Sequence, residues 1–462
     1  MNEEIINNKE KIVSLSNGTY DAMKNLATRL GLCANYDDLL YIREYYRKVG
    51  YYPTENELYM LDAILKKRKS SPIGYAFSKL KITDEVTASS YINIISDINR
   101  QNPKRRPIPP SYAELMHVKT GSEETSVLED ITCTSVFQND GALTIKAQNG
   151  SLLFSIGRRS DAKRSSDYVS GSAFVMLEPS CEMTDAEYLS AAHALCSDQE
   201  LSGIIIGVEK IGSFGILTSL ASVCEGVYID PSRLSDFSLP FSPATFAVSY
   251  EGRILIVTKK ENIEQLSVAA TNHGLSAIYF AKATSPGNLT VNRDIEGSFS
   301  LSCRFIKDIS YTPEYSEAIV GVEDTSLGCA PEPIIFESND SEPACSDSQN
   351  VRRYDGRIVS CTLALCADRP YTKAMCVVNN AIESLVSCGV YKKNITVSVR
   401  YGYTAENTEQ SRGAMFAMLL GAYEARKKAS VSECASALLP SEDIPFVACI
   451  AYANVSSTDN GN

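Results

Sequence analysis

Side chains suited to proton transfer near neutral pH are scarce in this sequence. Among its 462 residues there are only three histidines, His117, His193 and His273. His193 lies four residues after Leu189 on a predicted helix, and His273 directly precedes Gly274, a natural helix end. For both residues, packing or an interaction with the helix dipole is favoured over catalysis. The sequence therefore offers few candidates for a catalytic histidine.

Phosphate binding could draw on two basic runs, Lys66–Lys69 and Lys104–Arg106. Such runs are more commonly a solvated helix end or loop, and we favour that interpretation over a phosphate site. The sequence has no Walker loop, no dinucleotide-binding glycine fingerprint, no nucleophile elbow and no zinc-binding histidine helix. None of these common reaction classes is thus indicated by its own motif.

Composition and charge narrow the range of partners. The formal net charge of -12 repels nucleic acid and anionic membranes, because both bind mainly through Lys and Arg. No stretch approaches the roughly 18 apolar residues that span a bilayer, and residues 1–11 lack the apolar core of a signal peptide. The 14 cysteines form no Cys-x-x-Cys pair, which favours reduced thiols over disulfides or zinc. We predict a cytoplasmic protein with no nucleic-acid partner, no membrane partner and no metal site.

The elements that would position any site begin with a helical segment. Thr54 and Glu57 form a capping box after Pro53, which is a good helix start. Apolar residues recur at three- and four-residue spacing in three predicted helices, Tyr20–Leu30, Tyr36–Val49 and Glu55–Lys69.

From about residue 140, short strands alternate with helices. Thr184 and Glu187 form a second capping box, and the predicted helix Glu261–His273 ends at Gly274. The predicted strands are Ser151–Gly157, Gly203–Val208, Arg253–Thr258 and Ser276–Phe280. This pattern is typical of an α/β or α+β fold.

Residues 323–350 are rich in Ser, Asp, Glu and Pro, so we predict a flexible acidic linker there. A second unit of three strands and two helices is predicted beyond it. The strands are Arg357–Cys366, Ile395–Arg400 and Pro445–Tyr452, and the helices are Met375–Cys388 and Ser411–Ala429.

Four segments stand out as motifs: Tyr52–Leu58, Ile156–Asp161 with Gly171–Ala173, Gly212–Leu217 and Arg412–Ala425. They resemble phosphoribosylformylglycinamidine synthase (FGAM synthase), a glutamine- and ATP-dependent enzyme family of purine biosynthesis. The first segment, Tyr52-Pro53-Thr54-Glu55-Asn56-Glu57-Leu58, is similar to the Asn-Pro-Thr-Glu-x-Glu signature of the family's linker region. The resemblance places Arg68 where the family has a catalytic histidine. Arginine keeps its proton near pH 7, so Arg68 could stabilise an anion but could not act as a general base.

Two further segments resemble glycine-containing loops of the family. One is Ile156–Asp161 with Gly171–Ala173, for which an ordinary strand-end turn is the alternative, and the other is Gly212–Leu217. Glycine lets backbone N–H groups approach phosphate oxygens closely. The nucleotide-binding positions that the resemblance implies are Gly157, Arg158, Gly171, Gly212 and Gly215. Residues as large as Phe214 replace small ones of the family there, which should hinder access to the pocket.

The fourth segment, Arg412–Ala425, closely resembles the N-terminal subdomain of the family's second half. Where the family continues with a Gly-Gly-Lys-Asp-Ser-Met-Ser loop for phosphate and metal, this sequence reads Ser432–Leu439. Asn380 and Ser384 replace a metal-binding Glu and an Asn, and would hold magnesium weakly. The glutaminase domain and the last C-terminal subdomain of the family have no counterpart. We predict no catalytic residue and no cofactor, with ATP and magnesium expected only if activity is retained.

The resemblance implies an α+β fold in which a helical linker domain precedes α/β subdomains like those of PurM, the aminoimidazole ribonucleotide synthetase. The predicted domains are a helical linker-like domain (1–106), a reduced first N-terminal subdomain (107–178), a C-terminal subdomain (179–322), the acidic linker (323–350) and a second N-terminal subdomain (351–462).

Three functions remain open for such a chain. We favour a catalytically inactive FGAM synthase relative that acts through binding. The alternatives are a divergent ATP-dependent synthase subunit that works with other proteins, and a module that binds a purine nucleotide without turnover. The predicted partner is a second copy or a complete synthase, docked on the apolar face of Arg357–Cys366, unless residues 107–178 cover that face within the chain.

Overall fold

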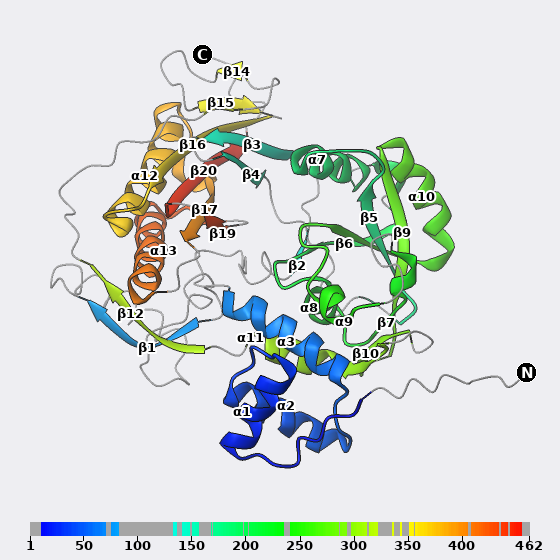
Figure 1. Ribbon diagram of the computed structural model, residues 1–462. Helices are drawn as coiled ribbons and strands as arrows, with labels where there is room; N and C mark the ends of the chain where they lie inside the picture. Colours follow the sequence, from blue (N-terminus) through cyan, green and yellow to red (C-terminus); the bar gives the residue numbers. More distant parts are fainter. Residues whose placement is uncertain are drawn as a thin grey trace, which may run out of the picture.

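Helices and mixed sheets alternate along the chain in the computed structural model, so the predicted α+β class is confirmed (Figure 1). The structure describes residues 11–70, 75–82, 133–135, 141–147, 150–156, 168, 170–196, 198–201, 203–234, 241–285, 287–292, 297–311, 314–321, 335–336, 342–343, 351–354, 356–404, 408–433, 436–441 and 444–454. Within these residues, no helix has the length and apolarity needed to cross a membrane.

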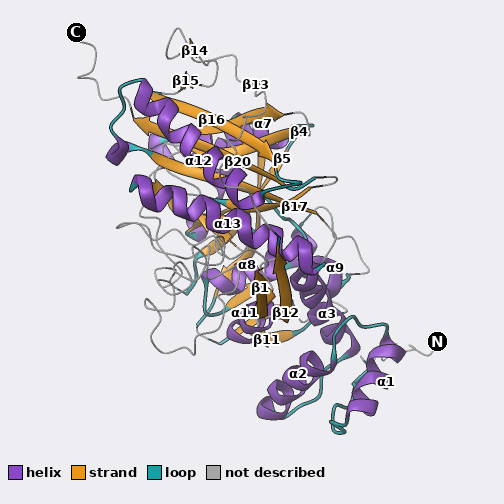
Figure 2. Ribbon diagram, turned by 90° about the vertical axis from the view of Figure 1, so that its left-hand side faces the viewer, coloured by secondary structure: helices purple, strands orange, loops and turns teal. Residues whose placement is uncertain are grey.

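Three helices open the fold, with the bounds that the sequence predicts to within one residue: α1 (Tyr20–Leu30), α2 (Tyr36–Val49) and α3 (Glu55–Ser70). The predicted capping box starts α3, because the Thr54 N–H donates to Glu57 Oε2 at 2.9 Å and the Glu57 N–H donates to Thr54 Oγ1 at 3.2 Å. The α1–α2 pair lies at the outer end of the molecule in both views, whereas α3 packs inward against α9 (Pro243–Ala247) and α11 (Cys303–Tyr311) (Figures 1 and 2).

An eight-stranded sheet forms the first α/β unit, in the order β11-β10-β7-β9-β5-β8-β6-β2. Helices α7 (Asp185–Cys196) and α10 (Ile263–Asn272) cover one face, and α8 (Ile216–Val223) and α11 pack on the other together with α3. The strands are β2 (Cys133–Ser135), β5 (Ala173–Pro179), β6 (Ile205–Ile211), β7 (Val227–Ile229), β8 (Ile254–Thr258), β9 (Leu275–Ala283), β10 (Asn288–Val291) and β11 (Ser300–Ser302).

A seven-stranded sheet forms the second unit, with α12 (Pro370–Ser387) and α13 (Glu409–Ala429) on one face. Helix α12 begins five residues before the predicted start at Met375, because Pro370 occupies its first turn, where a missing N–H costs nothing. The strands are β14 (Glu342–Pro343), β15 (Val351–Tyr354), β16 (Arg357–Leu365), β17 (Thr396–Thr404), β18 (Ser432–Glu433), β19 (Ala437–Ser441) and β20 (Phe446–Asn454).

Two smaller sheets complete the described residues. β1 (Tyr75–Ile82) pairs in parallel with β12 (Glu314–Val320), and β12 packs on α13 of the second unit. β3 (Gly141–Ala147) pairs with both β4 (Gly150–Ile156) and β13 (Ile335–Phe336). The described strands of 107–178 are thus shared between two sheets, and the expected boundary at 178 runs through β5. The described residues of the expected linker 323–350 are β13 and β14, both of which are paired.

The apolar face of β16 is not left uncovered. Val359, Cys361 and Leu363 are 0 to 4% exposed, and Ala448 and Ile450 of the neighbouring β20 are fully buried. The view that this face invites a partner is therefore corrected: the chain covers it by itself, as the alternative allowed, and β3 and β4 are drawn beside it (Figure 1).

The cysteines follow the sequence-based expectation with one exception. Nine described cysteines are free thiols, and several of them, such as Cys361 and Cys449, are buried in the sheets. Cys388, just beyond α12, is disulfide-bonded, so the prediction that all cysteines are reduced is wrong at this position. A half-buried cysteine beyond a helix end gave no spacing signal that separates it from the others.

Candidate functional site

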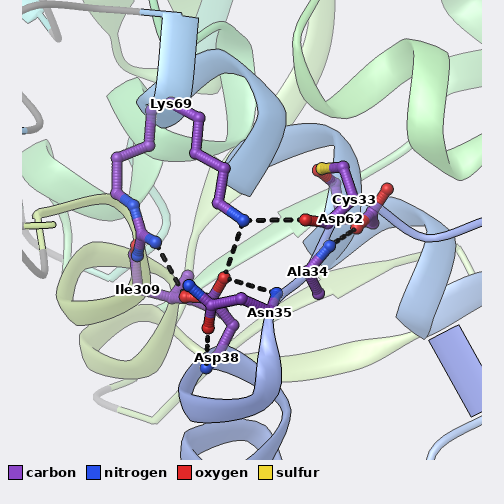
Figure 3. Close-up of polar contacts among 8 residues, drawn as sticks. Cys33, Ala34, Asn35, Asp38, Asp62, Lys69 and Ile309 are labelled. Atoms are coloured by element: carbon purple, nitrogen blue, oxygen red, sulfur yellow. Dashed lines mark hydrogen bonds and ion pairs between the residues drawn. The ribbon is translucent and has the colours of Figure 1, made fainter. Parts of the chain in front are cut away.

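Arg68, at the position of the family's catalytic histidine, forms a buried ion pair. Its side chain is 3% exposed, and Nη2 lies 2.7 Å from Oδ1 of Asp38 on α2, while Nη1 donates to the carbonyl of Ile309 on α11 at 3.2 Å. Lys69 adds a second contact to Asp38 at 3.1 Å and donates to the carbonyl of Cys33 at 2.7 Å (Figure 3). Within this basic run, Arg68 and Lys69 therefore fasten α3 to α2 and α11, whereas Lys66 is exposed and Lys67 pairs with Glu251 at the surface, as expected of a solvated helix end.

The charge state of Asp38 follows from this arrangement. Burial by itself would raise the pKa of the Asp38 carboxyl, but Arg68, the N–H of Asn35 and Lys69 together hold this pKa below its usual value of 3.8. Figure 3 shows the Asp38 carboxylate with Lys69 and the Asn35 N–H, and Asp62 fixes the adjacent loop by accepting from the Ala34 N–H at 2.8 Å. Arg68 therefore has its charge compensated within the chain.

The predicted nucleotide-binding positions divide into two groups. Gly157 and Arg158 lie outside the described residues. The Gly171 N–H donates to the carbonyl of Ala283 at 2.9 Å, and the Gly212 N–H donates to Ser219 Oγ at 3.1 Å. The Gly215 N–H donates to the carbonyl of Gly212 at 2.9 Å. These three donors are thus engaged inside the chain, and their nucleotide-binding role stays a prediction.

Gly215 is required by packing at the start of α8. Its φ of 85° lies in the left-handed region that favours glycine, and a Cβ there would meet the backbone of Val248. The next N–H, from Ile216, donates to the carbonyl of Ser249 at 3.1 Å. The turn between β6 and α8 is therefore closed against the loop that follows α9.

Phe214 occupies the turn where the family has a small residue. It is 1% exposed and packs in the core of the second unit, although the turn itself belongs to the first unit. The aromatic ring thus links a turn of the first unit to the core of the second, and the expected loss of access to a pocket stays a prediction.

The segment in place of the family's phosphate loop is part of the seven-stranded sheet. β18 and β19 pair in parallel with β17, from Thr396 opposite Ser432 to Thr404 opposite Ser441. Ser436 between them is 1% exposed, and its Oγ accepts from the N–H of Val399 at 2.9 Å. Its hydroxyl donates to Glu433, which also forms an ion pair with Arg426 of α13.

The two positions that the resemblance compares with a magnesium site carry Asn380 and Ser384, neither of which is acidic. Ser384, in the middle of α12, donates its hydroxyl to the carbonyl of Asn380 one turn earlier at 2.7 Å, so the side chain is engaged by its own helix. Across the described part of the chain, no group of three or more His, Cys, Asp and Glu side chains could hold a metal ion. Of the histidines, His193 lies on α7, His273 directly follows α10, and His117 lies outside the described residues.

Two buried polar contacts near these positions were not predicted. The Tyr168 hydroxyl donates to Oε1 of Glu209 on β6 at 2.6 Å, and Arg426 pairs with Glu433. Arg426 carried a usable signal, because it follows Met415, Leu419 and Ala422 on the apolar face of α13. Glu209 carried a weaker one, as a lone carboxylate in the apolar strand Ile205–Ile211.

No protein-family model and no curated protein matches this chain. Solved structures do match. Phosphoribosylformylglycinamidine synthase II from Thermotoga maritima is 12% identical over 66% of this chain and 57% of its own, with a TM-score of 0.46. T. maritima PurL complexed with AMPPCP is 12% identical over 90% of this chain and 83% of its own, with a TM-score of 0.49.

The structure of PurLQS from T. maritima is 14% identical over 66% of this chain and 58% of its own, with a TM-score of 0.44. In this alignment and in that with the synthase II, the chain spans less than two thirds of the matched protein. These proteins are of the family that the sequence motifs resemble.

Replacing Arg68 with Met should lower the free energy of unfolding by about 3 kcal/mol at pH 7, because Asp38 would stay buried without its main partner. A carboxyl group whose pKa is lower in the folded chain than in the unfolded chain stabilises the fold at pH values above the unfolded pKa. This contribution is lost as the pH falls through the folded pKa. The difference between the two proteins should therefore shrink below about pH 4. Urea denaturation across this pH range measures both effects.

Lys392→Met is the matched control, since Lys392 pairs with Glu383 on the surface and such a pair contributes about 1 kcal/mol or less. Equal effects of the two substitutions at pH 7 would contradict the buried ion pair.

Replacing Phe214 with Ala should cost about 3–5 kcal/mol, because a fully buried ring at the junction of two cores would leave a cavity. Tyr391→Ala, at a residue that is 73% exposed, should stay within about 0.5 kcal/mol. Denaturant titration of both variants tests this, and a stability of Phe214→Ala close to that of the wild type would show that the ring is not a packing element.

Proposed function

We propose that this chain is a relative of FGAM synthase in purine biosynthesis that has lost catalysis and acts through binding. The sequence motifs around Tyr52–Leu58 and Arg412–Ala425 support the relationship. The main support for the loss of catalysis is that the segment compared with the phosphate loop forms β18 and β19, which pair with β17.

A strand cannot serve as a phosphate cradle while it remains paired. A cradle needs several backbone N–H groups that converge on one anion, whereas strand residues direct theirs alternately to the two sides of the strand. In β18 and β19 the N–H groups that face β17 are engaged in the ladder. Ser436 and Glu433 hold the segment in place through Val399 and Arg426. Opening it would break a buried hydrogen bond and a buried ion pair together.

The remaining requirements of ATP-dependent amide activation point the same way. The reaction needs a magnesium ion and a group that transfers protons, besides the phosphate cradle. Arg68 replaces the catalytic histidine and is paired with Asp38, and the Ser384 hydroxyl is bound within α12. Losing one such element commonly costs about a hundredfold in rate, so the joint loss should leave no useful turnover.

A divergent subunit that works with other proteins is the second candidate. Partner proteins would have to supply both a proton-transfer group and a phosphate cradle here. The binding role proposed above, a purine-nucleotide ligand and the cytoplasmic location are each left to direct experiment.

The purified chain should form no formylglycinamidine ribonucleotide from ATP, magnesium, ammonia and formylglycinamide ribonucleotide, and it should not rescue a purine-auxotrophic strain that lacks the synthase. Arg68→His should restore nothing, because one histidine cannot replace the cradle and the metal ligands. A complete synthase in the same assay is the positive control. Product formation by the chain alone would overturn the proposal, and product formed only after addition of cell extract would favour the second candidate.

A further inference from the structure

β11 is the edge strand of the eight-stranded sheet. Among the strands that the structure describes, it pairs with β10 alone, in antiparallel register. The Val291 N–H donates to the Phe299 carbonyl at 3.0 Å, and the backbone groups of successive strand residues alternate between the two sides of the strand. Phe299 and Leu301 therefore direct their N–H and carbonyl groups toward β10. Ser300 and Ser302 direct theirs to the outer edge.

Two tyrosine hydroxyls, from α2 and from the turn after it, bind this outer edge. The Tyr51 hydroxyl donates to the Ser300 carbonyl at 3.3 Å. The Tyr45 hydroxyl accepts from the Ser302 N–H at 3.0 Å. In Figure 2, β11 lies at the lower end of the sheets, toward α2. One acceptor and one donor of the edge are thus engaged within the chain.

Packing holds both tyrosine rings at the edge. Tyr45 stacks on Phe305 of α11, with ring centroids 3.7 Å apart and an angle of 5° between the rings. Tyr51 meets the ring of Tyr46 edge-on at 5.3 Å, and Tyr46 itself is 1% exposed. The buried ion pair of Arg68 fastens α2 to α3. The two hydroxyls are therefore presented by packed elements, and little side-chain entropy remains to be lost when they bind the edge.

Without these hydroxyls, the outer edge of β11 would suit a second copy of the chain. In an antiparallel arrangement about a two-fold axis, the outward groups of Ser300 would meet those of Ser302 in the other copy, because each residue offers one N–H and one carbonyl. The residues of β11 are Ser, Leu and Ser, so the strand lacks the Lys or Pro that commonly protects a sheet edge. Protection of this edge has to come from another element.

We propose that Tyr45 and Tyr51 close the edge of the first sheet, so that α2 protects it against strand addition by a second copy. The contact is intramolecular, so the edge opens only when α2 moves away from β11. Loss of one of the two hydrogen bonds should raise the population in which the edge is open about fivefold.

Amide hydrogen exchange of the full chain tests the contact itself. Tyr45→Phe keeps the ring that stacks on Phe305 but removes the acceptor of the Ser302 N–H. The Ser302 amide should therefore exchange about fivefold faster or more in this variant. Tyr391→Phe removes a hydroxyl from a residue that is 73% exposed, and it should leave the Ser302 rate unchanged. An unchanged Ser302 rate in Tyr45→Phe would overturn the proposal.

The association rate of a double variant, Tyr45→Phe with Tyr51→Phe, tests the protection. Light scattering at a fixed chain concentration, below the unfolding temperature, should show association about tenfold faster or more than in the wild type. Adding Ser300→Pro should return the rate to that of the wild type. Proline removes an outward N–H and obstructs an incoming strand, while the bonds to β10 come from the neighbouring residues.

Circular dichroism checks that every variant keeps its helices and strands. Two association results would contradict the proposal. One is a double variant that associates no faster than the wild type. The other is fast association that Ser300→Pro leaves intact, because association would then use a surface other than β11.

Discussion

A backbone N–H can donate to a neighbouring strand or to a phosphate, but not to both, and this constraint governs the second unit of the protein. The outer edge of β17 is occupied by β18 and β19, in the segment that the resemblance compares with a phosphate loop. The pairing is secured from the side by Ser436 and from α13 by the ion pair between Arg426 and Glu433. The segment compared with a binding loop therefore completes the edge of the seven-stranded sheet.

Phe214 and Arg68, two other positions that differ from the family's motifs, are also packed or paired inside the chain. Phe214 closes the turn after β6 and ties the core of the first unit to that of the second. Arg68 binds α3 to Asp38 of α2 and to the end of α11, so a position that resembles a catalytic one now sets how the helical domain sits on the sheets. In both cases a side chain at a position that the resemblance assigns to a ligand site is packed or paired inside the chain.

The sequence predicted these elements well, because α1 and α2 carry strong amphipathic patterns and end at glycines, while α3 and α13 begin with capping boxes. Contacts between segments that are far apart in the sequence could not be predicted from periodicity. Nothing local shows that β12 packs on α13, that β5 belongs to the first sheet, or that the face of β16 is covered. Arg68 illustrates the limit at the site: its type excluded a general base, but its partner, thirty residues away on another helix, could only be seen in three dimensions.

Amide hydrogen exchange with and without magnesium and ATP tests the central claim most directly. If β19 is a permanent strand, the amides of Ala437–Ser441 that pair with β17 and the amide of Val399 should exchange slowly, at rates set by opening of the whole unit, and nucleotide should leave them unchanged. Fast exchange across 437–441 that becomes slow when magnesium and ATP are added would contradict the account, because it would reveal a loop that still closes on phosphate.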